Sequence, residues 1–177
     1  MEKDIAAILR EAHERELSCL IIGAHAVASF GFLRNTVDLD LLVPEERRSA
    51  WLDLLGGLGY RFFHGVAAFA QFESATQEGP PVDLMFVDEA TWQKLREGAI
   101  ETNLVGFPAF VPRPEYLVAL KLHAALSATR SKPESDWEDI RQIVRLCRLD
   151  PREESFRALI LRYGGEHGLA RIEQFAK

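Results

Sequence analysis

The stretch Thr36–Val43, which reads TVDLDLLV, decides the fold. Its Val and Leu residues predict a strand over Val37–Val43. Because side chains two positions apart on a strand share a face, Asp38 and Asp40 project together, with Thr36 one step behind them. The apolar residues at the alternate positions are expected to point into the core: Val37, Leu39, Leu41 and Val43.

This pair of carboxylates indicates a metal site. Two ionised carboxylates so close together repel each other by about 1 kcal/mol or more, depending on the local dielectric. A divalent cation reverses that repulsion, and Mg²⁺ favours one or two carboxylates together with waters and substrate phosphates. A lone Asp at a strand end is more often a turn or surface residue, but two inside an apolar strand favour a metal ligand role.

A third acid occupies a similar setting. Asp83 is the only charged residue in Val82–Val87 (VDLMFV), which follows the turn signal Gly79-Pro80-Pro81 and reads as a strand. If this strand neighbours the first, three carboxylates converge. Such a set can hold two metal ions about 3.5–4 Å apart for an in-line phosphoryl or nucleotidyl displacement. One of the acids could also accept the proton of the attacking hydroxyl.

A glycine turn precedes the acid pair. Leu20–Val27 (LIIGAHAV) reads as a strand, a turn at Gly23 and the start of a helix, and Gly23 stands about 15 residues before Asp38. Backbone N–H groups at such a turn can receive a phosphate. Many turns of this kind carry glycine only for tight packing. His25 is interpreted as a helix-start residue rather than a catalyst.

The rest of the chain predicts an α+β fold, with strands and helices mixed first and only helices from Pro114 onward. A hairpin is expected to turn at Gly65. The expected helices cover residues 4–16, 24–30, 45–58, about 89–97, about 114–129, 135–147 and 152–163. The expected strands cover residues 17–22, 37–43, 60–64, 67–73 and 82–87, with an extended segment at about 100–111.

Composition excludes several classes of protein. The 177 residues are 47% hydrophobic and 27% charged, the balance of one ordinary globular domain. A formal net charge of -6 argues against general coating of DNA or RNA. No apolar stretch approaches the roughly 18–20 residues that span a bilayer. Because Cys19 and Cys147 form no CxxC motif and Met1–Asp4 opens a helix rather than a signal peptide, we expect a cytoplasmic protein.

Other types of site are not indicated. The histidines show no metal-ligand spacing with cysteines, which argues against zinc, and no Walker-type P-loop is present. Basic residues on the last expected helices could form a local basic face, although a solvated helix surface is the plainer interpretation. These residues are Arg130, Lys132, Arg141, Arg145 and Arg148.

Together these elements resemble the nucleotidyltransferase superfamily that includes polymerase beta. More narrowly they resemble its AbiEii-like branch, to which several toxin components of toxin–antitoxin systems belong. That branch shows a glycine turn, an R-x-T-x-D-x-D strand, a third Asp, a later helix with a lysine and a D-x-x-D segment. The similar elements, within residues 17–147, are Gly23-Ala24, Arg34–Asp40 (RNTVDLD), Asp83, Glu115–Leu122 (EYLVALKL), Arg130 and Asp136–Ile140 (DWEDI).

The resemblance implies a small mixed β-sheet nucleotidyltransferase core flanked by helices, over residues 1–111. A C-terminal helical region, residues 112–177, would pack on that core. Mg²⁺ is the implied metal and a nucleoside triphosphate the implied substrate. The implied catalytic and metal-binding residues are Asp38, Asp40 and Asp83. The implied nucleotide-binding residues are Gly23, Ala24, Arg34, Thr36, Lys121 and Asp136.

Several of these residues could instead have a purely structural role. Lys121, the only charge in a long apolar helix, could be a lysine snorkelling at a core edge. Asp136 could serve the helix dipole within a capping box formed by Ser135 and Glu138, and Arg34 could be a solvent-exposed arginine. The superfamily usually has Gly-Ser or Gly-Gly at the turn, and alanine at position 24 cannot offer a hydroxyl to a phosphate.

Three functions are therefore open. The leading hypothesis is a Mg²⁺-dependent enzyme that moves a nucleoside monophosphate onto a hydroxyl of a protein, an RNA or a small molecule, with a toxin role and an antitoxin partner among the outcomes. The second is a catalytically weak or inactive binding or regulatory module of the same fold, which the alanine at position 24 favours. The third is a metal-dependent nuclease or phosphohydrolase, against which the absence of a lysine near Asp83 argues.

Overall fold

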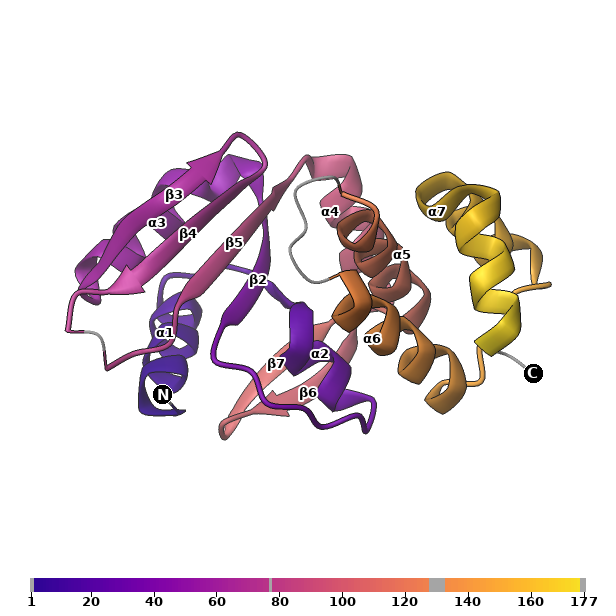
Figure 1. Ribbon diagram of the computed structural model, residues 1–177. Helices are drawn as coiled ribbons and strands as arrows, with labels where there is room; N and C mark the ends of the chain where they lie inside the picture. The colour runs from indigo at the N-terminus through magenta and orange to yellow at the C-terminus, as the bar shows by residue number, and fades with distance from the viewer. Residues whose placement is uncertain (1, 77, 128–132, 176–177) are drawn as a thin grey trace. The chain divides into compact units, whose positions relative to one another are not determined.

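The computed structural model describes residues 2–76, 78–127 and 133–175, which form two compact units (Figure 1). The sheet unit consists of Met1–His25 and Asn35–Pro112. The helical unit consists of Ala26–Arg34 and Arg113–Lys177. The chain thus leaves the sheet unit after the glycine turn and returns to it just before the acid pair.

A five-stranded mixed sheet with the strand order β1-β2-β5-β4-β3 forms the centre of the sheet unit. β2 and β5 are parallel, and the other neighbouring strands are antiparallel. The strands are β1 (Leu20–Ile21), β2 (Leu39–Pro44), β3 (Tyr60–Val66), β4 (Phe69–Ser74) and β5 (Val82–Val87). The parallel pair is central to the site, because it brings Asp40 and Asp83 together across a long separation in sequence.

Helices and a second hairpin complete the sheet unit. α1 packs on α3, α3 packs on β3, and the β6–β7 hairpin packs beside β1 and α1. α1 buries Ile5, Ile8, Leu9 and Ala12, whose helical spacing is visible in the sequence. The elements are α1 (Glu2–Glu14), η1 (Glu45–Arg47), α3 (Arg48–Gly57), α4 (Glu89–Arg96), β6 (Ile100–Leu104) and β7 (Phe107–Val111).

The helical unit contains α5 (Pro114–Ala125), α6 (Pro133–Leu146) and α7 (Glu154–Phe175), and α5 packs against both of the others. Pro114 starts α5, where a missing N–H leaves no hydrogen bond unmade. α2 (Gly23–Ser29) begins in the sheet unit and ends in the helical unit. In the described residues, no helix is both long and apolar enough to cross a membrane.

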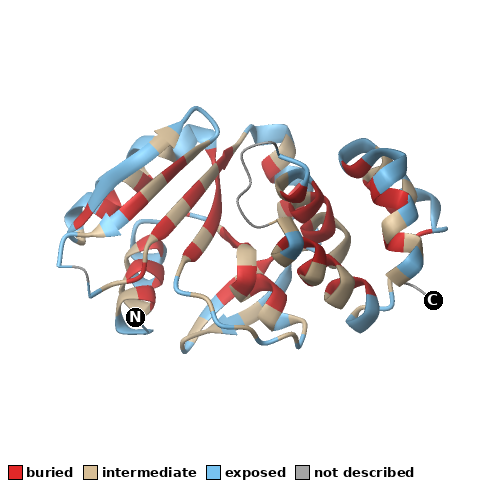
Figure 2. Ribbon diagram, in the orientation of Figure 1, coloured by how far each residue is buried: buried red, intermediate tan, exposed pale blue. Residues whose placement is uncertain are grey.

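Burial alternates along β5 and over Phe69–Phe72 of β4 (Figure 2). On β5, Val82, Leu84 and Phe86 are buried, whereas Asp83 and the residues at alternate positions are partly exposed. The buried face belongs to the core, and the other face carries the polar residues of the candidate site. The architecture confirms the predicted α+β fold with a mixed sheet, flanking helices and helices at the C-terminal end.

Several predicted boundaries are wrong. β2 begins at Leu39 rather than at residue 37, and Val37, predicted to face the core, is 64% exposed. The pairing of β2 with β5 cannot continue regularly past Val82, because the preceding residue Pro81 has no N–H. The predicted strand at residues 17–22 shrinks to β1, and the predicted helix at about 114–129 ends at Ala125.

The β3–β4 hairpin does not turn at Gly65. The strands pair as far as Val66 and Phe69, so the turn consists of Ala67 and Ala68. Gly65 lies inside β3, where a Cβ atom would come within 2.8 Å of the Phe69 carbonyl oxygen. Its glycine therefore serves a close approach of two strands.

Candidate active site

Asp40 and Asp83 are directly paired residues of the parallel strands β2 and β5. Side chains of paired residues in a sheet project to the same face, so the two carboxylates lie side by side. Both are partly exposed, although most of the residues around them on these strands are buried. The prediction from sequence depended on these strands being neighbours, and they are.

Gln71 extends this row of polar side chains onto β4. It pairs with Asp83 in the antiparallel register, and its Nε2 lies 3.2 Å from Asp83 Oδ1 and 3.1 Å from Oδ2. The amide therefore holds the carboxylate from the side opposite Asp40. Gln71 is not among the site residues predicted from the sequence. The available signal was a polar residue between Ala70 and Phe72, which are buried in the sheet.

Gly23 packs directly against Asp40. A Cβ atom built on Gly23 would lie 1.9 Å from Asp40 Oδ2, and the residue has a φ of +63°. The backbone is tied at the same point, since the Ile22 N–H donates to the Asp40 carbonyl oxygen at 3.0 Å. Only glycine allows the acid to lie against this turn. The glycine turn and the acid pair are thus parts of one structure.

Ala24 is buried and His25 is partly buried, directly after Gly23. Ala24 is only 3% exposed, so its side chain belongs to the core. Burial also lowers the pKa of His25 below its ordinary value, which favours the neutral imidazole at pH 7. Position 24 thus offers no side-chain hydroxyl, as the sequence indicated, and a phosphate at this turn would depend on backbone N–H groups.

Asp38 lies just before β2 and is partly exposed. The Leu39 N–H donates to the Pro81 carbonyl oxygen at 2.9 Å, which fixes the chain beside the start of β5. Asp38 and Asp83 both line a hollow of about 130 Å³. Thr36, two residues earlier, is also half-buried but does not line the hollow. The other lining residues are Phe63, Gln71, Phe72, Glu73 and Pro81.

The acids fit a divalent cation of the Mg²⁺ type. Asp40 and Asp83 offer neighbouring carboxylate oxygens, and the space where a Gly23 side chain would be is taken by the Asp40 carboxylate. Among the described residues, no group of three or more His, Cys, Asp or Glu is arranged to hold a metal ion. Mg²⁺ does not require such a group, because it is commonly bound by one or two carboxylates with waters and substrate phosphates.

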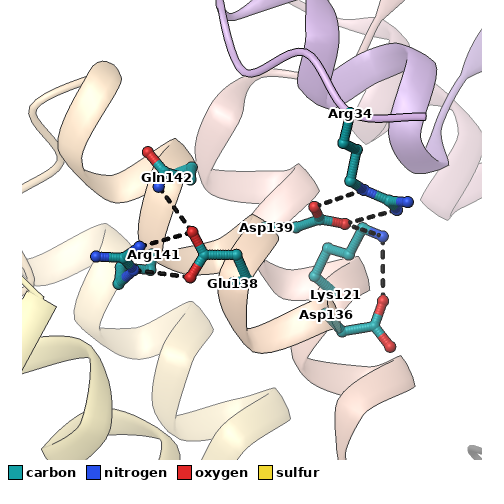
Figure 3. A network of polar contacts seen from close by, with 7 residues as sticks. All are labelled: Arg34, Lys121, Asp136, Glu138, Asp139, Arg141 and Gln142. Carbon is teal, nitrogen blue, oxygen red and sulfur yellow. Dashed lines mark hydrogen bonds and ion pairs between the residues drawn. The ribbon is translucent and has the colours of Figure 1, made fainter. Parts of the chain in front are cut away.

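Lys121 and Asp136, which the resemblance assigns to the nucleotide, lie in an ion-pair cluster of the helical unit (Figure 3). Lys121 Nζ is 3.1 Å from Asp136 Oδ1 and 2.8 Å from Asp139 Oδ2. Arg34 binds the same Asp139 carboxylate with two groups, Nε to Oδ1 at 2.9 Å and Nη2 to Oδ2 at 3.0 Å. Two basic and two acidic side chains thus meet in one cluster.

Most of this cluster is buried. The side chains of Asp136 and Asp139 are 0% exposed and that of Lys121 is 8% exposed, whereas that of Arg34 is 30% exposed. Lys121 is therefore not a lysine that extends along a core edge to place its charge in water, and that interpretation is wrong. Its ammonium group is held by two buried carboxylates. Asp139 was not among the predicted site residues, although the D-x-x-D spacing contains it.

The proposed capping box is also wrong. α6 starts at Pro133, so Ser135 lies inside the first turn and is not the N-cap. Asp136 is fully buried and accepts a hydrogen bond from Lys121. Two buried carboxylates one helical turn apart, at positions 136 and 139, therefore face α5 and not solvent.

The basic residues of α6 make surface contacts. Arg141 Nη2 lies 2.7 Å from Glu138 Oε1, and hydrogen bonds from Arg141 and Gln142 lower the pKa of Glu138. Arg145 and Arg148 follow on the same helix and just after it. Arg130 and Lys132 of the predicted basic face lie outside the described residues.

Known structures resemble the whole chain. One is a solution structure of the antibiotic-resistance factor ANT(2'')-Ia. The match covers 99% of this chain and 97% of the ANT(2'')-Ia chain, with 19% sequence identity and a TM-score of 0.71. A crystal structure of ANT(2'')-Ia with adenylyl-2''-tobramycin covers 99% and 98%, with 20% identity and a TM-score of 0.67. The lincosamide antibiotic adenylyltransferase LnuA, bound to lincomycin, covers 82% and 98%, with 16% identity and a TM-score of 0.60.

Neither a protein-family model nor a curated protein matches the chain by sequence. The AbiEii-like branch therefore remains a prediction. The likeness in structure extends over nearly the full length of the known proteins and includes the sheet that carries Asp40 and Asp83. The chain has the α+β fold of the nucleotidyltransferases.

Proposed function

We propose that this protein transfers a nucleoside monophosphate from a nucleoside triphosphate to a hydroxyl group. One observation carries the proposal: Asp40 and Asp83 are paired on parallel strands, with Gly23 packed on Asp40. The reaction forms a bond between the acceptor oxygen and the α-phosphorus, and it breaks the bond from that phosphorus to the β-phosphate oxygen. Pyrophosphate leaves, and the hydroxyl proton passes to a carboxylate or to water.

Asp38, Asp40 and Asp83 are the residues that would hold Mg²⁺ and, through it, the triphosphate. When bound, the cation supplies charge neutralisation on the phosphates and alignment of the attacking and leaving oxygens. Gln71 orients the carboxylate of Asp83 through its two hydrogen bonds. Asp38 lines the hollow, and we assign to it the proton of a hydroxyl that enters there, because Gln71 already engages Asp83.

The nucleotide contacts proposed from the resemblance are Gly23, Ala24, Arg34, Thr36, Lys121 and Asp136. At Gly23 and Ala24 only backbone N–H groups are available, since the Ala24 side chain is buried. Arg34 is the most exposed charged side chain of its cluster. It is therefore the member best suited to touch a phosphate directly.

The acceptor is best proposed as a small molecule that carries hydroxyl groups. Two of the structural neighbours are complexes with small antibiotics or their adenylylated product. The hollow beside Asp38 and Asp83 is about 130 Å³ and is lined by the aromatic ring of Phe63 as well as by acids. A net charge of -6 also disfavours a nucleic-acid acceptor. A protein or RNA acceptor would be found by the same assay.

The test is a transfer assay with Mg²⁺ and each labelled nucleoside triphosphate, offered with hydroxylated small molecules, RNA and total protein. We expect label on a small molecule and an equal amount of pyrophosphate. Binding of the triphosphate without any product would instead support the second function, an inactive binding module, which the alanine at position 24 favours. Release of nucleotides from RNA without a triphosphate would favour the nuclease function.

A role as a cytoplasmic toxin with an antitoxin partner is a narrower proposal that rests on the AbiEii-like resemblance. A small antitoxin gene next to the gene for this chain would support it. Growth arrest on expression, relieved by that neighbour and absent in an Asp40→Ala variant, would test it. Expression without any growth defect would argue for the small-molecule acceptor alone.

A further inference from the structure

Phe63 is an exposed aromatic residue on β3, the strand at one edge of the sheet (Figure 1). The pairing of β3 with β4 shifts by one residue between Phe62 and His64, so Phe63 is the extra residue of a β-bulge. Bulges occur often at sheet edges and beside active sites, where they redirect a side chain. Phe63 is 65% exposed and lines the same hollow as Asp83.

The position of Phe63, rather than its exposure, distinguishes it. Single exposed apolar residues are common on protein surfaces. Phe62 is exposed to a similar degree, 61%, but its ring contacts the buried Phe72 edge to face, with ring centroids 6.0 Å apart. Phe63 instead offers its ring to a hollow that is lined by the acids of the candidate site. The bulge therefore adds an apolar surface to an otherwise largely polar site.

The hollow is unsuited to a triphosphate. The described residues that line it include three acids, Asp38, Glu73 and Asp83, and no Lys, Arg or His. Like charges this close repel each other, and a cation held by Asp38 and Asp83 would leave the charge of Glu73 uncompensated. The hollow therefore favours the acceptor over the phosphates of the nucleotide.

The order of the strands gives the same assignment. The glycine turn follows β1, which pairs with β2 on the side away from β5, and Gly23 packs on Asp40. The hollow borders Asp83 and extends over β4 to β3, on the opposite side of the acid pair. In an in-line displacement the attacking and leaving oxygens lie on opposite sides of the phosphorus. With the triphosphate at the Gly23 turn, the attacking hydroxyl arrives from the side of the hollow.

We infer that Phe63 is an acceptor-binding residue, whose ring packs against the apolar face of a ring of the acceptor. Neighbouring strands are about 4.8 Å apart, so Phe63 lies roughly 10 Å from Asp83, two strands away. An acceptor that reaches both is longer than one sugar ring. The inference rests on the proposed function and narrows the acceptor to a hydroxylated molecule of at least two rings. Every residue that it uses belongs to the sheet unit.

The test is steady-state kinetics with Mg²⁺, a nucleoside triphosphate and the acceptor that the wild-type chain labels in the transfer assay. Phe63→Ala should raise the KM of the acceptor about tenfold, because it removes a contact with a ring. The contact is equal in the ground state and the transition state, so kcat should change by no more than about twofold. The KM of the triphosphate should also stay within about twofold. Phe63→Tyr keeps the ring and should restore the KM of the acceptor.

Phe62→Ala is the matched control. It makes the same substitution one residue away at similar exposure, but Phe62 does not line the hollow. It should leave both KM values within about twofold of wild type. Circular dichroism should show that both alanine variants fold, since both side chains are largely exposed. A single-ring fragment of the acceptor should respond to Phe63→Ala by no more than about twofold, because it does not reach β3.

The outcomes separate this inference from the proposed function. If Phe63→Ala and Phe62→Ala have the same KM for the acceptor, the inference is overturned and the proposed function stands. A raised KM for the triphosphate with an unchanged KM for the acceptor would also overturn it, because Phe63 would then stack on the nucleobase. If the wild-type chain labels no acceptor, the proposed function fails and the acceptor role of Phe63 fails with it.

Discussion

Gly23 and Asp40 are in such close contact that a single added carbon on the glycine would overlap the carboxylate. The contact joins the turn after β1 to the acid on β2, and β2 in turn pairs Asp40 with Asp83 on β5. Three segments far apart in sequence therefore meet around one carboxylate. The arrangement leads to predictions about stability, metal binding and rate.

Gly23→Ala should both destabilise the protein and disturb Asp40. The positive φ alone is unfavourable for alanine by about 1–2 kcal/mol, and the overlap with the Asp40 carboxylate adds to that. Gly59→Ala is the control, since Gly59 also has a positive φ, +81°, but has open space where a Cβ would be. Urea unfolding should show the larger loss for Gly23→Ala. Equal losses would mean that the contact with Asp40 is relaxed in solution.

Mg²⁺ should stabilise the wild-type chain through the paired carboxylates. At a Mg²⁺ concentration a hundredfold above the dissociation constant, binding raises the free energy of unfolding by about 2.7 kcal/mol. For a chain of this size this corresponds to an increase in Tm of about 5–10 °C. Asp40→Asn and Asp83→Asn should reduce this shift to near zero. They should also slightly raise the Tm in metal-free buffer, because a repulsion between neighbouring carboxylates is removed. An unchanged Mg²⁺ shift in both variants would place the metal elsewhere.

Gln71→Leu should impair catalysis without unfolding the protein. The substitution removes both hydrogen bonds to Asp83 from a partly exposed strand position. We expect about a tenfold or larger fall in kcat/KM and a higher Mg²⁺ concentration for half-maximal rate. Gln93→Leu, which changes an exposed glutamine on α4, is the control and should be neutral. Full activity of Gln71→Leu would show that Asp83 needs no support from β4.

The buried cluster should dominate the stability of the helical unit. Asp139→Asn breaks a buried network and should lower the free energy of unfolding by about 3–5 kcal/mol. Glu138→Gln breaks an exposed pair and should lower it by no more than about 1 kcal/mol. Urea denaturation of the two variants gives the comparison. Similar values for both would mean that Asp139 is well solvated.

His25 should make the protein less stable in mild acid. Burial lowers its pKa in the folded state below the ordinary value of 6.5, so the unfolded chain binds more protons once the pH falls toward and below 6.5. Stability from this group is therefore present above pH 6.5 and lost as the pH falls through the folded pKa. His25→Gln should flatten the dependence of Tm on pH between about 7 and 5. The same slope in the variant would assign it to other groups.

The sequence could predict what depends on local pattern. The strand Val82–Val87 matches the structure residue for residue, because Gly79-Pro80-Pro81 precedes it and every residue in it except Asp83 is apolar. The acid pair was visible for the same reason. The pairing of Asp40 with Asp83 could not be predicted, because contacts between distant segments set the order of the strands. The spacing of residues in the sequence carries no information on that order.

The burial of charged residues also could not be predicted from the sequence. The D-x-x-D spacing shows that residues 136 and 139 share a helix face, but not that this face is buried against Lys121. The same pattern also fits a solvated helix start with a capping box. The prediction for Val37 was wrong in the opposite direction. Its apolar side chain suggested a place in the core, but Val37 lies before the first paired residue of β2 and is exposed.

Transfer of a nucleoside monophosphate by wild-type protein and by Asp40→Asn tests the central claim most directly. The measurement is the rate of pyrophosphate release, matched to labelled acceptor, with Mg²⁺ and a nucleoside triphosphate. We predict that Asp40→Asn lowers this rate about a thousandfold or more, whereas Asp53→Asn, an exposed acid on α3, leaves it unchanged. Transfer by Asp40→Asn at the wild-type rate would contradict the assignment of this carboxylate to the active site.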